Sequence, residues 1–330
     1  MSLLQVKNLA VAFRNGRKTV PVIDGISFEI ERGEIMALVG ESGCGKSAGS
    51  LALTRLNSAN AVISADSARF ESSSGAVELL QLSAEELRKI RGGGIAYIFQ
   101  EPLSSLNPVF RIGEQIAEVL ELHRPEIKDR RSEVIRLLEE VGIPDPAARM
   151  MNFPHELSGG MQQRVMIAMA LAGKPDLLIA DEPTTALDVT IQAQIIALLD
   201  KLRRENGTSI ILITHNFGVV AQLADKVAVM YAGRIVESAA TAELIDSPCH
   251  PYTKALLAAV PVLRGKNRRL ATIPGQVPSP HEFPAGCRFC TRCSLAAGCG
   301  AERCREQLPP EIEISRGHKV WCWDCSNKGK

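Results

Sequence analysis

One eight-residue segment, Gly40–Ser47 (GESGCGKS), constrains this chain more than any other. It follows a short apolar run, Ile35–Val39, of the kind expected for a parallel strand that is buried on both faces. The residues after it, Ser47–Leu53, read as the start of a helix. A strand, a glycine-rich loop, a lysine, a hydroxyl residue and a helix in this order form a phosphate-binding loop, whose backbone N–H groups surround an anion. The segment therefore predicts a nucleotide site, with Lys46 on the β- and γ-phosphates and the Ser47 hydroxyl offered to Mg²⁺.

Three further apolar runs end in polar side chains. Asp176–Glu182 ends in two carboxylates, Ser209–His215 ends in a histidine, and Ile95–Gln100 ends in a glutamine. Open α/β sheets build their sites from residues at the ends of such strands. An aspartate in this place, Asp181, can hold Mg²⁺ through water, and a glutamate one residue later, Glu182, can polarise the attacking water.

A fifth element is the turn Leu157–Arg164 (LSGGMQQR), which precedes a strongly helical stretch from Val165 to Ala172. Ser158 and the two glycines after it are predicted to lie at a helix N-terminus, which is a second anion-binding geometry. One nucleotide does not need two such cradles from one chain. A head-to-tail pair of chains explains both, because this turn then faces the γ-phosphate held by the partner.

Together these segments resemble the ATP-binding subunits of ABC transporters. The resemblance implies an α/β fold of the P-loop NTPase type: a RecA-like core, an antiparallel β subdomain and a helical subdomain at about 101–172. It implies an ATPase domain over 1–245 and a small cysteine-rich C-terminal extension over 246–330. The length of 330 residues agrees with one large domain and an appendage.

The resemblance also assigns residues. Glu182, His215 and Gln100 would be catalytic, Ser47, Gln100 and Asp181 would face Mg²⁺, and Asp188 would belong to the D-loop (Ala186–Asp188). The signature turn facing the partner's ATP would use Ser158, Gly159, Gly160 and Gln162, with Met161 replacing the more common glutamine. ATP itself would contact Phe13, Ser42, Gly43, Cys44, Gly45, Lys46, Ser47, Ala48, Gln100, Asp181 and His215.

Further segments, such as Gln100–Pro108 and His250–Thr253, narrow the resemblance to the importers of oligopeptides, dipeptides and nickel, and within them to the dipeptide-importer ATPases. The expected function is ATP hydrolysis that energises import of di- or oligopeptides. The implied partners are two permease subunits, a sister ATPase in a heterodimer and, indirectly, an extracytoplasmic solute-binding protein. Nickel, glutathione or another small solute is the alternative cargo. A soluble ABC ATPase acting on ribosomes or DNA, and a metal-sensing regulatory ATPase, are alternatives of other classes.

Charge and hydropathy indicate where the chain works and which partners to expect. A net charge of +1 gives no indication of nucleic acid as a partner. No apolar run approaches the ~18 residues that a membrane span needs, and the N-terminal residues do not form a signal-peptide core. The expected location is peripheral, on the cytoplasmic face of the membrane.

Eight of the nine cysteines lie after residue 245, which in a reducing compartment argues for metal rather than disulfides. In the family pattern Cys287, Cys293, Cys304 and Cys322 would hold a four-iron, four-sulfur cluster, with Cys299 a rival third ligand. The pairs Cys290–Cys293 and Cys322–Cys325 would instead suit zinc, the second choice of metal. A reduced, metal-free segment is the remaining alternative. These cysteines lie far in sequence from every ATP motif, which predicts a structural or docking role.

Overall fold

The computed structural model describes residues 2–72, 75–185, 187–259, 272–295 and 301–325. By their contacts they divide into two compact units. Unit 1 is mainly Arg69–Ile213, with two short N-terminal pieces; unit 2 consists of Gln5–Glu29, Ile35–Ala68 and Thr214–Lys330. Among the described residues, no helix is both long and apolar enough to cross a membrane.

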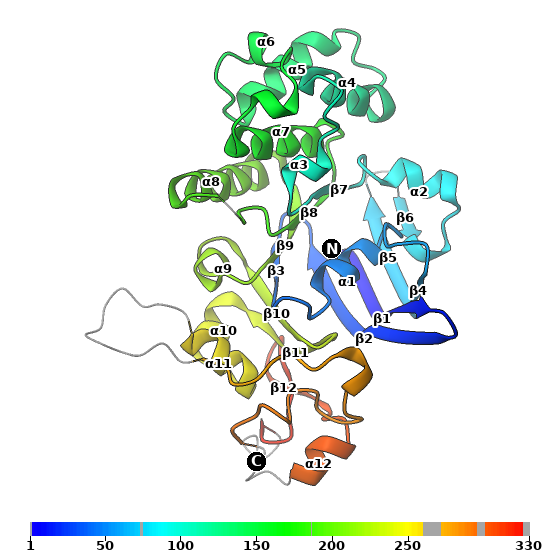
Figure 1. The fold of residues 1–330 in the computed structure, drawn as a ribbon, viewed down its shortest axis with the longest axis vertical. Coiled ribbons are helices and arrows are strands. Elements are labelled where there is room, and N and C mark those ends of the chain that lie inside the picture. The colour runs from blue at the N-terminus through cyan, green and yellow to red at the C-terminus, as the bar shows by residue number, and fades with distance from the viewer. Residues whose placement is uncertain (1, 73–74, 186, 260–271, 296–300, 326–330) are drawn as a thin grey trace, which may run out of the picture. The chain divides into compact units, whose positions relative to one another are not determined.

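Unit 1 contains three parallel strands and a group of helices. Strands β7, β8 and β9 pair in register, with Ile95 beside Leu177 and Leu177 beside Ser209. Helices α4 to α7 pack on one another as one group, drawn in green in Figure 1. The elements that lie wholly or largely in this unit are β5 (Ser67–Ser72), β6 (Gly75–Glu78), η1 (Leu79–Gln81), α2 (Ala84–Ile90), β7 (Ile95–Ile98), α3 (Pro102–Ser105), α4 (Ile112–His123), α5 (Arg130–Glu140), α6 (Pro146–Arg149), η2 (Pro154–Glu156), α7 (Gly159–Ala172), β8 (Leu177–Asp181), α8 (Val189–Asn206) and β9 (Ser209–Thr214).

Local chemistry explains where several of these helices begin and end. Ser83 and Glu86 form the predicted capping box of α2. Ser158 caps α7, as predicted. Helix α8 begins at the carboxylate of Asp188 and ends at Gly207, which has a left-handed φ of 68°.

Unit 2 carries the phosphate-binding loop between β3 and α1. Strand β3 is buried at all five positions and pairs in parallel with β10. Strands β10 and β11 form the predicted hairpin around Ala232-Gly233. The elements of this unit are β1 (Ser2–Asn15), β2 (Lys18–Glu31), β3 (Ile35–Val39), α1 (Lys46–Ala52), β4 (Ala61–Ser64), α9 (Phe217–Leu223), β10 (Lys226–Tyr231), β11 (Arg234–Ala240), α10 (Thr241–Asp246), α11 (Pro251–Ala258), η3 (Pro280–Glu282), α12 (Ala301–Glu306), β12 (Glu311–Ser315) and β13 (His318–Trp321).

The C-terminal strands extend this sheet. Strand β13 pairs with β11, with Val320 opposite Glu237, and β12 pairs with β13, so that the order within unit 2 is β12-β13-β11-β10-β3. Phe289 also enters the hydrophobic core, where Tyr231 and Tyr252 are fully buried. Residues of the predicted C-terminal extension therefore share a sheet and a core with the phosphate-loop strand. The predicted boundary at residues 245 and 246 stays a prediction.

The hairpin glycine Gly233 yields a test of this packing. Its φ is +81°, its N–H donates to the Cys44 carbonyl over 2.9 Å, and a Cβ atom would collide with the Val22 carbonyl. Gly317, in the β12–β13 turn, has a φ of +82° but open space around it. We expect Gly233→Ala to lower the free energy of unfolding by about 2–5 kcal/mol and Gly317→Ala by about 1–2 kcal/mol, because only the first adds a collision to the left-handed strain. Urea unfolding of both variants measures the difference, and equal losses would contradict this account of the turn.

Candidate functional site

The phosphate-binding loop of unit 2 holds its lysine inward. Lys46 is only 5% exposed, and its Nζ donates to the carbonyls of Gly40 (2.8 Å) and Glu41 (3.0 Å). Cys44 is buried beside it, with Sγ 3.8 Å from Nζ, and burial raises the pKa of the Cys44 thiol. The ammonium group is thus already oriented by the loop that a phosphate would enter.

Two glycines let this loop pack tightly. A Cβ atom on Gly40 would meet the Met230 carbonyl. Gly45 has a φ of +101°, and a Cβ atom there would lie 2.5 Å from Ile23. A side chain at Gly40 would collide with a backbone carbonyl, and a side chain at Gly45 would have to adopt a left-handed φ and displace Ile23, which is why the motif needs glycine here.

The other predicted ATP contacts of unit 2 are placed as follows. Ser42 and Gly43 are exposed, while Ser47 and Ala48 are half-buried in the first turn of α1. Phe13 is half-buried on β1 opposite Ala61 of β4, and His215 is exposed directly after β9. The adenine contact of Phe13 and the catalytic part of His215 stay predictions.

Unit 1 brings Glu182, the predicted catalytic carboxylate, together with two hydrogen-bond partners. Glu182 Oε2 accepts hydrogen bonds from Gln100 Nε2 (3.3 Å) and Thr185 Oγ1 (2.9 Å). Glu182 also has a φ of +46°, which a non-glycine residue adopts only at a cost, while its N–H bonds the Ile213 carbonyl over 2.8 Å. Asp181, the last residue of β8, is partly exposed. Strand ends thus bring Gln100 and Glu182 together as predicted, and the sequence analysis missed Thr185, although a hydroxyl residue three positions after the carboxylate was a visible signal.

The signature turn forms the capped N-terminus of α7 and is exposed to solvent. Ser158 Oγ accepts from the Met161 N–H (3.4 Å), and Ser158 and Gly159 are exposed at the start of α7. Gln162 is 5% exposed, and its amide donates to the carbonyls of Pro154 and Leu157. Its side chain therefore braces the turn from within, whereas Ser158 and Gly159 face outward.

The carboxylate of the predicted D-loop residue Asp188 caps the N-terminus of α8. It accepts from the N–H groups of Thr190 (3.0 Å) and Ile191 (2.9 Å) at the start of α8. Ala186 lies outside the described residues.

The C-terminal cysteines surround one small pocket with apolar walls. Its lining includes the four predicted ligands, Cys287, Cys293, Cys304 and Cys322, and also Cys290. Burial raises the pKa of the Cys287 thiol to about 12, whereas a hydrogen bond with Cys325 lowers the pKa of the Cys322 thiol. Cys299 lies outside the described residues. Soft thiol donors in apolar surroundings fit an iron–sulfur cluster in their chemistry. Among the described residues, however, no three of these Sγ atoms lie within 4.8 Å of one another, as the ligands of a single zinc ion would. Both the cluster and zinc stay predictions.

A second group of ligand-type side chains was not predicted. The ligand atoms of Glu237, Cys249 and His318 lie within 4.8 Å of one another. Glu237 is fully buried and accepts from the N–H groups of Cys249 (2.7 Å) and His250 (2.9 Å), and His318 Nε2 lies 2.8 Å from it. These bonds already satisfy the carboxylate, so the group acts as a polar anchor between β11, β13 and the start of α11. No sequence motif pointed to it, because its members are up to 81 residues apart.

Two family models match the sequence. The ABC transporter model matches residues 23–185, and the model for the C-terminal region of oligopeptide and dipeptide transporters matches residues 236–299. A probable peptide ABC transporter ATP-binding protein of Sinorhizobium fredii is 47% identical over 97% of this chain and 94% of its own length. An oligopeptide transport ATP-binding protein of Bacillus subtilis is 45% identical over 99% and 98%, and a dipeptide transport ATP-binding protein of Haemophilus influenzae is 45% identical over 98% and 95%.

Solved structures agree on the fold. A dimeric ATP-binding cassette in a post-hydrolysis state with ADP and phosphate aligns with a TM-score of 0.63, 26% identity and coverage of 72% of this chain and 98% of that one. A cassette from Clostridium perfringens, part of an ABC transporter complex, aligns at 0.60 with 27% identity over 74% and 91%. The expected ABC-type nucleotide-binding fold is confirmed, and ATP and Mg²⁺ are the ligands expected of it. The chain belongs to the family of ABC transporter ATP-binding proteins and is an ABC-type ATPase.

Proposed function

We propose that this chain is the ATP-hydrolysing subunit that energises import of di- or oligopeptides. The observation that carries the proposal is the match to the transporter C-terminal region, joined to near-full-length relatives that are named as peptide, oligopeptide or dipeptide transport proteins. Those names favour a peptide over nickel as the cargo. The partners would be two permease subunits and a sister ATPase, with a solute-binding protein acting indirectly. The chain would then work at the cytoplasmic face of the membrane.

Hydrolysis would use the phosphate-binding lysine, the predicted catalytic carboxylate and the predicted Mg²⁺ ligands. Lys46, held by the Gly40 and Glu41 carbonyls, would stabilise negative charge on the β- and γ-phosphates. Glu182, oriented by Gln100 and Thr185, would polarise the attacking water, and His215 would assist at the γ-phosphate. Ser47, Gln100 and Asp181 offer the oxygen ligands that Mg²⁺ prefers, and the ion would neutralise charge on the phosphates.

Glu182→Gln tests the assigned base and the transport function together. ATP binding should persist, while turnover falls by about 10²–10⁴-fold, the usual effect of losing a general base. In cells that need a dipeptide for growth, uptake of labelled dipeptide should stop in step with turnover. Glu205→Gln, an exposed glutamate of α8, is the matched control and should change neither. Near-normal turnover would move the role to another residue such as His215; lost turnover with intact dipeptide uptake would refute the cargo.

We also propose that ATP is sandwiched between two chains, with Ser158, Gly159 and Gly160 facing the partner's γ-phosphate. The exposed start of α7 supports this, because helix N-termini attract anions and Gln162 braces the turn from inside. A dimeric solved relative with a TM-score of 0.62 adds support. A partner ATPase would supply the second half of each site.

Gly159→Asp tests the sandwich. A Cβ atom added at Gly159 meets no atom within 4 Å, and aspartate is favourable at a helix N-terminus, so the fold should persist. The new charge would oppose the partner's phosphate, so ATPase activity of the assembled complex should be abolished, while nucleotide affinity of the isolated chain stays within about twofold. Gly159→Ala, which adds no charge, should retain most of the activity. Loss of nucleotide binding by the isolated Gly159→Asp chain would show that the turn acts on its own chain's nucleotide.

We propose further that Cys287, Cys293, Cys304 and Cys322 hold a four-iron, four-sulfur cluster, with zinc the alternative metal. The supporting observation is that all four thiols line one apolar pocket although they span residues 287 to 322. Thiolate softness favours such clusters. The thiols must lose their protons on loading, so the raised pKa of Cys287 makes loading weaker at low pH.

Metal analysis of anaerobically purified protein tests the cluster. The protein should be brown, with iron and acid-labile sulfide at about four each per chain. Cys304→Ser should lose the visible absorbance, and Cys299→Ser should keep it; the reverse result would make Cys299 the third ligand. Cys249→Ser is the control, because Cys249 is not one of the four predicted ligands, and it should keep the visible absorbance. Stoichiometric zinc in colourless protein would refute the cluster.

A further inference from the structure

The loop that carries three of the cysteines also carries two buried arginines. In this cysteine loop, Cys287–Cys293, Arg292 forms a bidentate ion pair with Glu41, the second residue of the phosphate-binding motif. The distances are 2.7 Å and 3.0 Å, and the arginine side chain is 4% exposed. The two residues are 251 positions apart, so the fold alone brings them together.

The guanidinium group of Arg292 is fixed on several sides. It donates to the carbonyl of Pro274 (2.8 Å) and to the Tyr231 hydroxyl (3.3 Å). Glu41 is held by its main chain as well, because its N–H donates to the hydroxyl of buried Tyr252 over 2.9 Å. A planar guanidinium group that donates to this many acceptors is held in one orientation, and the ammonium group of a lysine cannot make the same set of hydrogen bonds.

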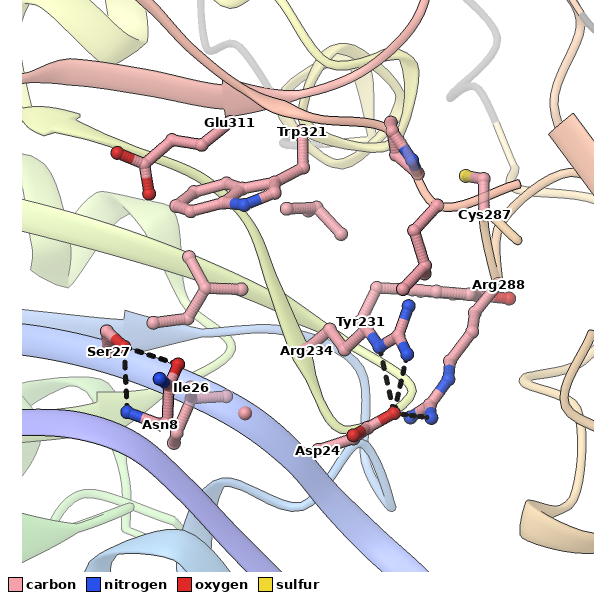
Figure 2. Close-up of a pocket in the computed structure, with 15 residues that line it drawn as sticks. Asn8, Asp24, Ile26, Ser27, Tyr231, Arg234, Cys287, Arg288, Glu311 and Trp321 are labelled. Carbon is pink, nitrogen blue, oxygen red and sulfur yellow. Dashed lines mark hydrogen bonds and ion pairs between the residues drawn. The ribbon is translucent and has the colours of Figure 1, made fainter. Parts of the chain in front are cut away.

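The rest of the cysteine loop is anchored to the same unit. Figure 2 shows Asp24 of β2 between Arg234 and Arg288, with its carboxylate accepting from both. Arg288 also donates to the Ala232 carbonyl in the β10–β11 turn. Phe289 packs edge-on against Tyr231, with ring centroids 5.1 Å apart. The loop is therefore a firm support from which Arg292 can act.

Glu41 connects this support to the phosphate-binding lysine. Its side chain pairs with Arg292, and its backbone carbonyl accepts from Lys46 Nζ over 3.0 Å. Without Arg292 the Glu41 carboxylate would stand uncompensated beside a site for a highly negative ligand. The residue whose carbonyl orients Lys46 would also keep only one of its two anchors, the Tyr252 hydroxyl on its N–H. Both effects weaken phosphate binding.

We propose that Arg292 is a positioning residue for ATP: acting through Glu41, it makes the cysteine loop a part of the phosphate-binding loop's support. This goes beyond the ATP motifs, none of which includes a C-terminal residue. It rests on the ATPase fold of the chain. The ion pair needs no metal, so the proposal stands or falls separately from the iron–sulfur cluster and from the peptide cargo.

The experiment is Mg·ATP binding to the full chain, measured by calorimetry or with a fluorescent ATP analogue. Arg292→Gln should raise the Kd by about 5- to 50-fold, a typical coupling between linked sites. The double variant Glu41→Gln/Arg292→Gln should recover to within about threefold of the parent, because no carboxylate is left uncompensated. Arg303→Gln is the matched control in the same C-terminal region, since Arg303 stacks over Trp323 at 3.5 Å, and it should leave the Kd unchanged.

A general loss of stability would lower the folded fraction without moving the Kd of the folded protein, so unfolding midpoints are measured beside binding. A folded Arg292→Gln protein whose Kd stays within about twofold of the parent overturns the proposal. If that variant does not fold, Arg292→Lys decides. A Kd raised threefold or more supports the positioning role, and an unchanged Kd refutes it.

Discussion

The structure of unit 2 depends on the close approach of the phosphate-binding loop to the β10–β11 turn. Gly40 packs against the Met230 carbonyl, and the Gly233 N–H donates to the Cys44 carbonyl. Neither glycine leaves room for a side chain, because a Cβ atom on Gly40 would meet the Met230 carbonyl and one on Gly233 would meet the Val22 carbonyl. Because the loop is clamped in this way, its carbonyls can hold Lys46 inside before any phosphate arrives, and little ordering remains for the ligand to impose.

Features set by neighbouring residues were predictable from the sequence. The strand, loop and helix around Lys46, the capping box of Ser83 and Glu86, and the start of α7 at Ser158 each follow from a few consecutive residues. So does the turn at Ala232-Gly233, where two positive φ angles reverse the chain. The grouping of Gln100 with Glu182 was also predictable, because parallel strands end at one edge of a sheet.

Features set by packing between distant residues were not predictable. The cysteines from Cys287 to Cys293 predicted a metal site. Nothing in the sequence indicated that Arg292 pairs with Glu41 or Arg288 with Asp24, because these partners are 251 and 264 residues apart. The distance of the cysteines from the ATP motifs suggested a separate role, whereas the fold places Arg292 on the motif itself. The left-handed backbone of Glu182 was equally hidden, since glutamate does not indicate a positive φ.

The cysteine loop is held by the ion pairs of two buried arginines, Arg292 with Glu41 and Arg288 with Asp24, which fix its position more strictly than apolar packing would. An apolar contact between the cysteine loop and the phosphate-binding loop would tolerate small shifts, because packing is not directional. A guanidinium group 4% exposed is stable only when its carboxylate and carbonyl partners lie in place, since an unpaired buried charge is strongly unfavourable. Arg292 therefore permits one position of Glu41, and Arg288 permits one position of the cysteine loop on Asp24. Both arginines lie between cysteines of one seven-residue segment, so the same short piece of backbone carries thiols that line the pocket and the arginine that holds the phosphate-binding loop.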